Sequence, residues 1–281
     1  MYAVWKIKNM LICAALAAVL IVAASAAGMP DEGVKLPIIM YHSVLRDTSR
    51  TGKYIITPQS IEEDLKYLAG HGYKSVTAGE VMAYVEDGTP LPPKPYMLTF
   101  DDGCYNNLTY VLPLLEKYDA YAVVSVVGSY SKNYSDTGEA SAAYGYLRWQ
   151  DISELAASGR IEIGNHSYDM HSVGAGRIGA QRYKGEPLEE YRQKFAADCE
   201  QTQEILREKC GISPVIYTYP FGAYCDVSQE ILKNKGFKMI LTCNEHINNI
   251  TRDAESLQLL GRFNRSGRVD TYSFFKKCKI F

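Results

Sequence analysis

The chain has 281 residues, of which 47% are hydrophobic, so it can bury a sizeable core in one large domain or in two smaller ones. Its formal net charge is −2, and its basic residues form no cluster or stripe. Because nucleic-acid binding needs a basic patch, we expect no nucleic-acid partner. The 22 tyrosines outnumber the 8 phenylalanines, and tyrosine suits wet clefts and sugar faces as well as ordinary packing.

The N-terminus has the pattern of an export signal. Two lysines precede an apolar run from Met10 to about Ala24, which ends in an Ala-Ser-Ala sequence of the kind that signal peptidase cleaves. The run is close to the shortest membrane-spanning length, so an uncleaved anchor is the alternative. We predict that residues 1–33 are a signal peptide or membrane anchor plus linker. Residues 34–281 are then a catalytic domain that is extracellular or anchored to the outer face of the cytoplasmic membrane.

Strand and helix patterns alternate along residues 34–281. In chain order, strands are predicted at 36–41, 74–76, 96–100, 120–127, 161–164, 215–219, 238–242 and 259–260. Helices are predicted at 58–70, 78–85, 106–117, 149–157, 188–209 and 227–235, with a last one from about residue 270. Residues 128–145, rich in Ser, Tyr and Gly, are predicted to be a long functional loop or lid. This alternation predicts βα units and a parallel sheet, open or closed.

Two adjacent carboxylates follow the predicted strand at 96–100. Asp101 and Asp102 repel each other and are costly to bury unless a positive group lies beside them, and a divalent cation is the usual solution. Gly103 then permits an immediate turn. Because Asp-Gly is also a common turn dipeptide, a plain turn is the alternative interpretation.

Two histidines follow the predicted strand at 161–164. His166 and His171 are five residues apart, a spacing that does not align them on one helix face, so we place them on a loop. With one carboxylate they make a two-histidine, one-carboxylate set that leaves positions open for water and substrate. Two surface histidines in a polar loop are the alternative. Both polar clusters follow strands, where βα barrels and doubly wound sheets carry their active sites.

These residues carry a family resemblance. Residues 99–103 (TFDDG) and 166–172 (HSYDMHS) resemble the first two motifs of polysaccharide deacetylases, carbohydrate esterase family 4. Residues 40–44 (MYHSV) and 217–224 (YTYPFGAY) resemble the branch of that family that acts on N-acetylhexosamines of cell walls or exopolysaccharides. The resemblance extends over about residues 36–265, nearly all of the predicted exported part.

The resemblance implies a single catalytic domain with a distorted (β/α)7-type barrel. It also implies a divalent metal held by Asp102, His166 and His171, with zinc first and cobalt, nickel, manganese or iron as alternatives. Asp101 would be the general base that takes a proton from the attacking water.

Five further residues are expected to contact the substrate. A backbone N–H just after Gly103, that of Cys104 or Tyr105, would hold the oxyanion of the tetrahedral intermediate. The motif after the strand at 215–219 would supply the other contacts, from Tyr219, Pro220 and Phe221.

The sequence departs from the family pattern at two places. Residues 217–218 supply no arginine where the third motif often carries one that orients the base, and we expect Arg262 or Arg265 to replace it by approaching in space. The late Leu-x-His motif of the general acid is also missing. His42, after the first strand, is the better candidate for this role and His246 the second, while a satisfied core histidine is the alternative for His42.

We therefore predict an exported, monomeric, metal-dependent polysaccharide N-deacetylase that releases acetate from N-acetylhexosamine residues. Peptidoglycan N-acetylglucosamine or N-acetylmuramic acid is the first substrate, and a secreted poly-N-acetylhexosamine is the next. An uncleaved N-terminus would add a membrane contact. The alternative of another class is a non-catalytic glycan-binding protein on the same fold. A third interpretation, an amide hydrolase for small molecules, would require a deep closed pocket.

Overall fold

The computed structural model describes residues 32–174 and 176–281. Nearly all of the predicted export segment, residues 1–33, lies outside the described residues, and its nature stays a prediction. Within the described part of the chain, none of the helices combines the length and the apolar character needed to cross a membrane. The six cysteines in this part are free thiols.

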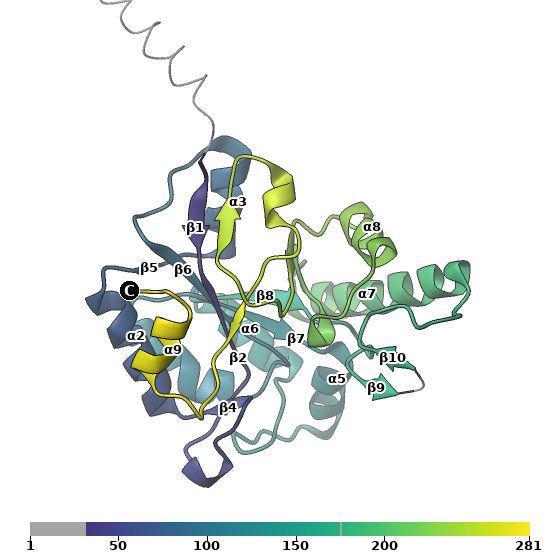
Figure 1. Ribbon diagram of the computed structural model, residues 1–281. Helices are drawn as coiled ribbons and strands as arrows, with labels where there is room; N and C mark the ends of the chain where they lie inside the picture. The colour runs from purple at the N-terminus through teal and green to yellow at the C-terminus, as the bar shows by residue number, and fades with distance from the viewer. Residues whose placement is uncertain (1–31, 175) are drawn as a thin grey trace, which may run out of the picture. The chain divides into compact units, whose positions relative to one another are not determined.

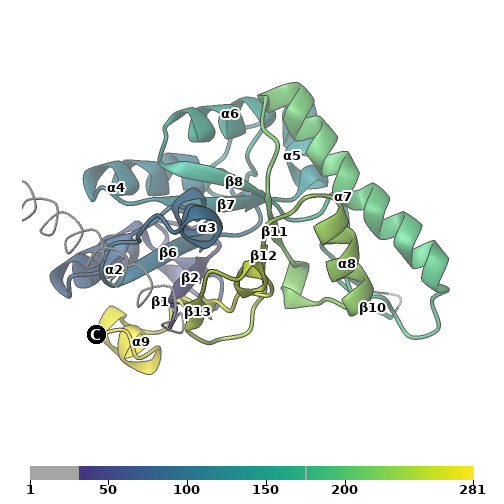
Figure 2. The same cartoon turned by 90° about the horizontal axis from the view of Figure 1, so that it is seen from above.

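A curled parallel sheet forms the centre of residues 34–281 (Figures 1 and 2). Its strand order is β12 (Met239–Leu241), β11 (Ile216–Thr218), β8 (Ile161–Asn165), β7 (Ala122–Val126), β6 (Pro95–Phe100), β2 (Ile38–Tyr41) and β14 (Phe263–Asn264). The short β5 (Lys74–Ser75) pairs with the start of β6. All residues of β6 and β7 are buried, as expected for strands of a parallel sheet that is covered on both faces.

The sheet curls until its two ends share one segment of chain. Leu260 pairs with Leu241 of β12, whereas Phe263 pairs with Ile39 of β2. Arg262 lies between these two pairings, where the chain leaves one neighbour and joins the other. The final strand is therefore split, and the fold is the predicted distorted barrel with a single catalytic domain.

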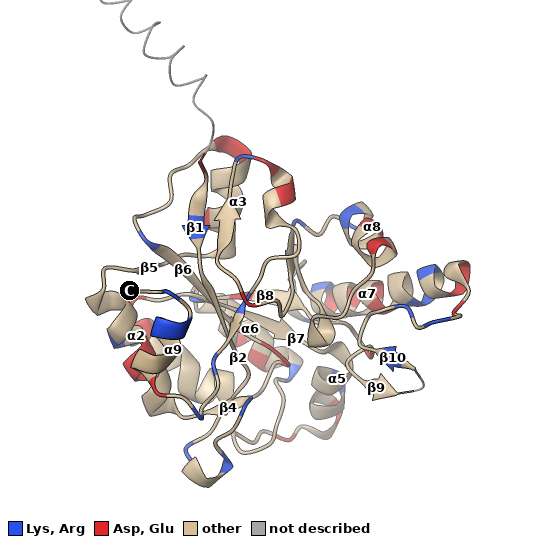
Figure 3. Ribbon diagram, in the orientation of Figure 1, with Lys and Arg blue, Asp and Glu red and all other residues tan. Residues whose placement is uncertain are grey.

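Helices lie outside the sheet (Figure 2). They are α2 (Pro58–Gly70), α3 (Ala78–Asp87), α4 (Leu112–Lys117), α5 (Gly128–Thr137), α6 (Trp149–Ala157), α7 (Leu188–Cys210), α8 (Asp226–Asn234) and α9 (Thr271–Lys277). Local signals fix several ends: Thr57 caps α2, which has proline at its first position, and a capping box of Thr77 and Glu80 starts α3. Charges of both signs alternate along α7 and α8 (Figure 3), and Arg192 pairs with Glu230 between them.

Several elements differ from the sequence prediction. Residues 128–137 form α5, so the prediction of one long loop at 128–145 is wrong for its first half. The polar, Tyr-rich composition hid the helix, because only Gly128 and Ser131 are buried on it. Residues 107–111 form a single π-helical turn before α4. Three pairs of very short strands were not predicted, because two or three residues carry no periodicity: β1 (Val34–Leu36) with β13 (Asn248–Ile250), β3 (Ser43–Val44) with β4 (Ile55–Ile56), and β9 (Val173–Gly174) with β10 (Arg177–Ile178).

A buried ion pair joins the last strand to α2. The guanidinium of Arg265 donates from Nε and Nη2 to the two carboxylate oxygens of Asp64, at 2.8 and 3.0 Å. Tyr41 and Thr271 donate their hydroxyls to the same carboxylate, at 2.9 and 2.7 Å. Three parts of the chain that are distant in the sequence therefore meet at Asp64: the end of β2, α2, and residues 265–271.

We predict that Arg265→Met lowers the free energy of unfolding by about 3–5 kcal/mol, because it leaves the Asp64 carboxylate buried without its cation. Urea denaturation monitored by circular dichroism measures this change. Arg268→Met, at an exposed position on the same segment, is the matched control and should stay within about 0.5 kcal/mol of the wild type. Equal losses in the two variants would contradict the prediction.

Candidate active site

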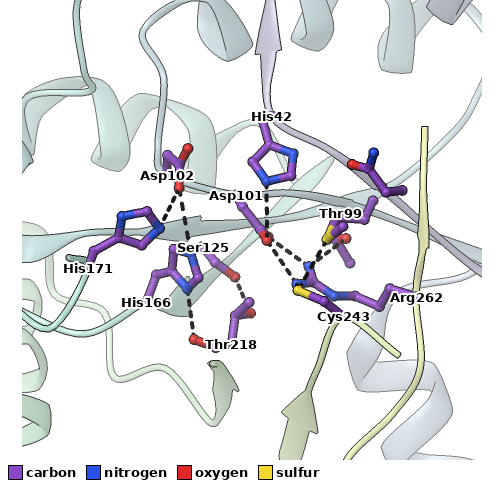
Figure 4. A network of polar contacts seen from close by, with 12 residues as sticks. His42, Thr99, Asp101, Asp102, Ser125, His166, His171, Thr218, Cys243 and Arg262 are labelled. Carbon is purple, nitrogen blue, oxygen red and sulfur yellow. Dashed lines mark hydrogen bonds and ion pairs between the residues drawn. The ribbon is translucent and has the colours of Figure 1, made fainter. Parts of the chain in front are cut away.

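The two adjacent aspartates lie where β6 ends and the chain turns sharply. Asp102 has a φ of 71° and Gly103 a φ of 68°, both in the left-handed region. A side chain at residue 103 would meet Val126 Cγ1 at 3.0 Å and Val126 Cα at 3.3 Å, so only glycine fits there without movement. This turn sends the two carboxylates in different directions (Figure 4).

Asp102 faces two imidazoles that come from the loop after β8. Its Oδ1 lies 3.1 Å from His171 Nε2 and 3.6 Å from His166 Nε2. All three atoms lie within 4.8 Å of one another. Although burial alone would raise the pKa of Asp102, the two imidazoles hold it well below its usual value. The same contact raises the pKa of His171 against the effect of burial.

The donor set fits a divalent metal. His166 Nδ1 lies 2.7 Å from the carbonyl oxygen of Thr218, so this nitrogen carries a proton, and in the neutral form of the ring the lone pair of Nε2 faces Asp102. The Oδ1 atom of Asp102 is buried and accepts no hydrogen bond from any residue in 32–174 or 176–281. A lone pair and a carboxylate that face each other at 3.6 Å repel unless a cation lies between them.

Asp101 instead pairs with Arg262. Two parallel hydrogen bonds, of 2.7 and 2.8 Å, join the guanidinium to the carboxylate, and both side chains are buried. Arg262 also donates to the carbonyl of Thr242 at 2.8 Å and to the hydroxyl of Thr99 at 3.0 Å (Figure 4). Burial acts to raise the pKa of Asp101, but the guanidinium outweighs it, so the carboxyl is ionised at neutral pH. Of the two arginines considered from the sequence, Arg262 reaches Asp101, and Arg265 binds Asp64.

His42 approaches Asp101 from the end of β2. Its Nε2 lies 4.0 Å from Asp101 Oδ2, and its ring packs against Tyr54 with centroids 4.7 Å apart. The other ring nitrogen, Nδ1, is buried and has no hydrogen-bond partner in the part of the chain that the structure describes. Burial lowers the pKa of His42 despite the two aspartates nearby, so the ring is neutral at neutral pH. His246, the second candidate for the acid, does not line the cavities described next.

Two adjoining cavities open at this end of the barrel. The larger, of about 430 Å³, contains Asp101, Asp102, His42, His166 and His171, and the smaller has about 260 Å³. Both are lined by His42, Tyr54 and Asp102, so together they form one groove across the site. Most of the other lining side chains were not predicted; they include Lys53, Glu245 and Asn264 in the larger cavity and Arg50, Tyr144 and Tyr146 in the smaller one. Most of them lie between the regular strands and helices near the site, a position that could have identified them.

Of the three side chains expected to contact the substrate after β11, one lines this groove. Phe221 lines the larger cavity, and its ring lies 4.6 Å from that of His171. Tyr219 and Pro220 are buried and do not line either cavity, and the Tyr219 hydroxyl donates to Ser228. The structure therefore does not bring these two side chains to the groove: Tyr219 directly follows β11 and packs in the core against Tyr217. Their contact with substrate stays a prediction.

Only one of the two expected oxyanion donors is free to act. The N–H of Tyr105 donates to the carbonyl of Gly145 at 2.8 Å, and Leu147 N–H donates to Gly103. These two bonds lie on either side of the antiparallel pair Cys104–Tyr146, which is therefore a non-hydrogen-bonded pair. The N–H of Cys104 consequently forms no hydrogen bond to Tyr146. Cys104 lines the smaller cavity beside His42 and Asp102.

A sequence profile described as polysaccharide deacetylase matches residues 88–240, more than half of the chain. The chain belongs to the polysaccharide deacetylase family. The match begins before β6 and ends in β12, so it includes both aspartates and both histidines of the site.

Named relatives and solved structures agree with this assignment. A poly-β-1,6-N-acetyl-D-glucosamine N-deacetylase of Escherichia coli K12 is 26% identical over 232 residues, which cover 76% of this chain and 34% of that protein. The chain thus spans about a third of the length of this relative. A de-N-acetylase from Aggregatibacter actinomycetemcomitans has the same fold, with a TM-score of 0.73, 23% identity and coverage of 86% and 98% of the two chains. IcaB from Ammonifex degensii also has a similar fold, with a TM-score of 0.66 and 26% sequence identity. The match covers 82% of this chain and 91% of IcaB.

We predict that excess Zn²⁺ raises the melting temperature of the metal-stripped full chain, because a ligand that binds only the folded state stabilises it by about 2.7 kcal/mol at a hundredfold excess over Kd. Scanning calorimetry with and without the metal measures this shift. His166→Ala should abolish the shift, and His71→Ala, an exposed histidine at the end of α2, should retain it. An equal shift in both variants would place the metal elsewhere.

Proposed function

We propose that this chain is a metal-dependent polysaccharide N-deacetylase. The observation that carries the proposal is the separation of two adjacent carboxylates into two environments. Asp102 joins the two histidines, and Asp101 is held ionised by Arg262. One carboxylate is thereby suited to bind a cation and its neighbour to accept a proton, which is the division of labour that amide hydrolysis by water requires.

Asp102, His166 and His171 would hold the metal, and zinc is the first candidate because it favours imidazole and carboxylate ligands. Cobalt, nickel, manganese and iron share these preferences and are the alternatives. When bound, the metal would polarise the acetamide carbonyl and increase the acidity of water.

The protein's own groups would move the protons. Asp101 would take a proton from water as its oxygen attacks the acetamide carbon, and Arg262 would keep the carboxylate ionised and oriented. The N–H of Cys104 would donate to the oxyanion. His42 is neutral at rest and lies 4.0 Å from Asp101. It would receive from Asp101 the proton taken from water and deliver it to the sugar nitrogen as the C–N bond breaks. The products are acetate and a free amine.

The proposed substrate is a polymer of N-acetylglucosamine. The similarity to poly-β-1,6-N-acetyl-D-glucosamine N-deacetylases favours a β-1,6-linked exopolysaccharide and moves it ahead of peptidoglycan, the first expectation from the sequence. The shape of the site also supports a polymer, because the groove extends over two cavities. The exposed rings of Tyr54, Tyr144 and Phe221 offer apolar faces along it, against which sugars pack. Residues 40–44 support membership of the branch that acts on such polymers. We further propose that residues 34–281 are exported and that residues 1–33 are either cleaved or kept as a membrane anchor. We also propose that the protein is a monomer.

Acetate release tests this proposal. The metal-stripped full chain, reloaded with Zn²⁺ or Co²⁺, is expected to release acetate from β-1,6-linked N-acetylglucosamine oligomers faster than from purified peptidoglycan. Asp101→Asn should reduce kcat by about 10²–10⁴, because the amide cannot accept the proton. An enzymatic acetate assay measures the rate.

Glu204→Gln, an exposed change on α7, is the control for this experiment and should leave the rate unchanged. Binding of the oligomers without acetate release under any metal would support the non-catalytic glycan-binding protein instead. A faster rate on peptidoglycan would instead make peptidoglycan the preferred substrate, as first expected from the sequence.

A second prediction concerns the pH dependence of the reaction. Arg262 lowers the pKa of Asp101, and the base acts only when ionised, so activity falls as the pH drops through this pKa. Arg262→Met removes the positive charge and should move the acid limb of the kcat/KM profile to higher pH by about 1–3 units. Arg262→Lys, which keeps a charge but loses the parallel bonds, should shift it less. An acid limb that stays in place in both variants would rule out Asp101 as the titrating base.

A further inference from the structure

A carboxylate of α7, Asp198, holds the chain between the two histidines. Its Oδ1 accepts the backbone N–H of Tyr168 at 2.8 Å, and its Oδ2 accepts that of Asp169, also at 2.8 Å. The side chain is half-buried, and burial raises its pKa although the two N–H groups act in the opposite direction. Both oxygens of one carboxylate thus accept hydrogen bonds from successive amides of the four residues 167–170, which form no helix or strand.

The start of α5 holds the same interval from the other side. The N–H groups of Gly128 and Ser129 donate to the carbonyls of Ser167 and Tyr168, at 3.0 and 2.9 Å. The approach is close, since a Cβ at residue 128 would lie 2.6 Å from Tyr168 Cδ2. Ser167 itself has a φ of 71°, and its N–H donates to Asn165. The path of the backbone from His166 to His171 is therefore imposed by hydrogen bonds from outside it.

The two histidines differ in how they are anchored. His166 is fully buried, and its Nδ1 is fixed at 2.7 Å from Thr218. The His171 ring is partly exposed, and among the residues that the structure describes its Nδ1 contacts the Tyr130 hydroxyl at a long 3.4 Å. The position of His171 Nε2 beside Asp102 therefore depends on the path of the backbone that leads to it.

We propose that Asp198 is a positioning residue for His171, and that its carboxylate sets the affinity of the Asp102, His166 and His171 set for a divalent metal. The inference rests on the proposed function for the identity of the metal set. Asp198 itself touches none of the three ligands. It acts by fixing two peptide groups, which lie two and three residues before His171. Groups that orient metal ligands in this way typically change metal affinity by 10–100-fold when they are removed.

Binding of Co²⁺ to the full chain tests this inference without reference to activity. The substitution Asp198→Asn is nearly isosteric, but the new amide would turn an N–H toward one of the two backbone N–H groups. We expect it to weaken Co²⁺ binding about 10–100-fold, measured by competition with a chelator, and to change the visible absorption of the bound ion. Asp198→Ala, which removes both acceptors, should have at least this effect. Glu204→Gln on the same helix is the matched control.

Two results would overturn the inference. One is a lower melting temperature of Asp198→Asn with unchanged Co²⁺ affinity and spectrum, which would assign Asp198 a structural role only. The other is a wild-type chain that binds no Co²⁺. If Asp198→Ala does not fold, Asp198→Asn decides, because it keeps the volume and one acceptor oxygen. Weakened Co²⁺ binding in a chain that releases no acetate would support the positioning role while it contradicts the deacetylase function.

Discussion

The buried pair of Asp101 and Arg262 is the interaction on which the rest of the site depends. A carboxylate and a guanidinium that are withdrawn from water require good geometry and further hydrogen bonds, and here Thr99 and Thr242 supply them. The guanidinium comes from the point where the last strand leaves β12 and joins β2. A regular closing strand would pair with both neighbours along its length, whereas this segment pairs first with β12 and then with β2. The distortion of the barrel and the pairing of the base therefore have the same location.

The pair also explains how two adjacent carboxylates coexist. The left-handed backbone at Asp102 and Gly103 turns the chain, so that Asp101 faces the guanidinium and Asp102 faces the imidazoles. Each carboxylate has its own positive or polarisable partners, and the pKa of each is lowered for a different reason.

The sequence was sufficient for the fold class and for most regular elements. Thr57-Pro58 and the apolar spacing identified α2, and Trp149–Ala157 was predicted with the bounds that α6 has. The meeting of Asp102 with His166 and His171 could also be anticipated, because parallel strands bring their carboxyl ends to one edge. These successes rest on local signals or on a topological rule that applies to every βα fold.

Other features depend on contacts that no local pattern encodes. The choice between Arg262 and Arg265 stayed open because both lie on an irregular segment, and only the split of the strand directs one to Asp101 and the other to Asp64. Tyr219 looked like a substrate contact because it lies in a motif, yet its ring packs in the core against Tyr217. Asp198 gave no signal at all, since it is one charge among many on α7 and its partners lie about thirty residues earlier.

The segment that closes the barrel is held on both sides of its pairing with β2. Arg262 reaches inward to Asp101, and three residues later Arg265 reaches Asp64 of α2. The N–H of Arg265 also donates to the carbonyl of Met40, two residues before His42. Tyr41, which donates to Asp64, directly precedes His42. These bonds tie the end of β2, which carries His42, to the segment that carries Arg262. The outer ion pair and the pairing of the proposed base are therefore attached to the same short piece of chain.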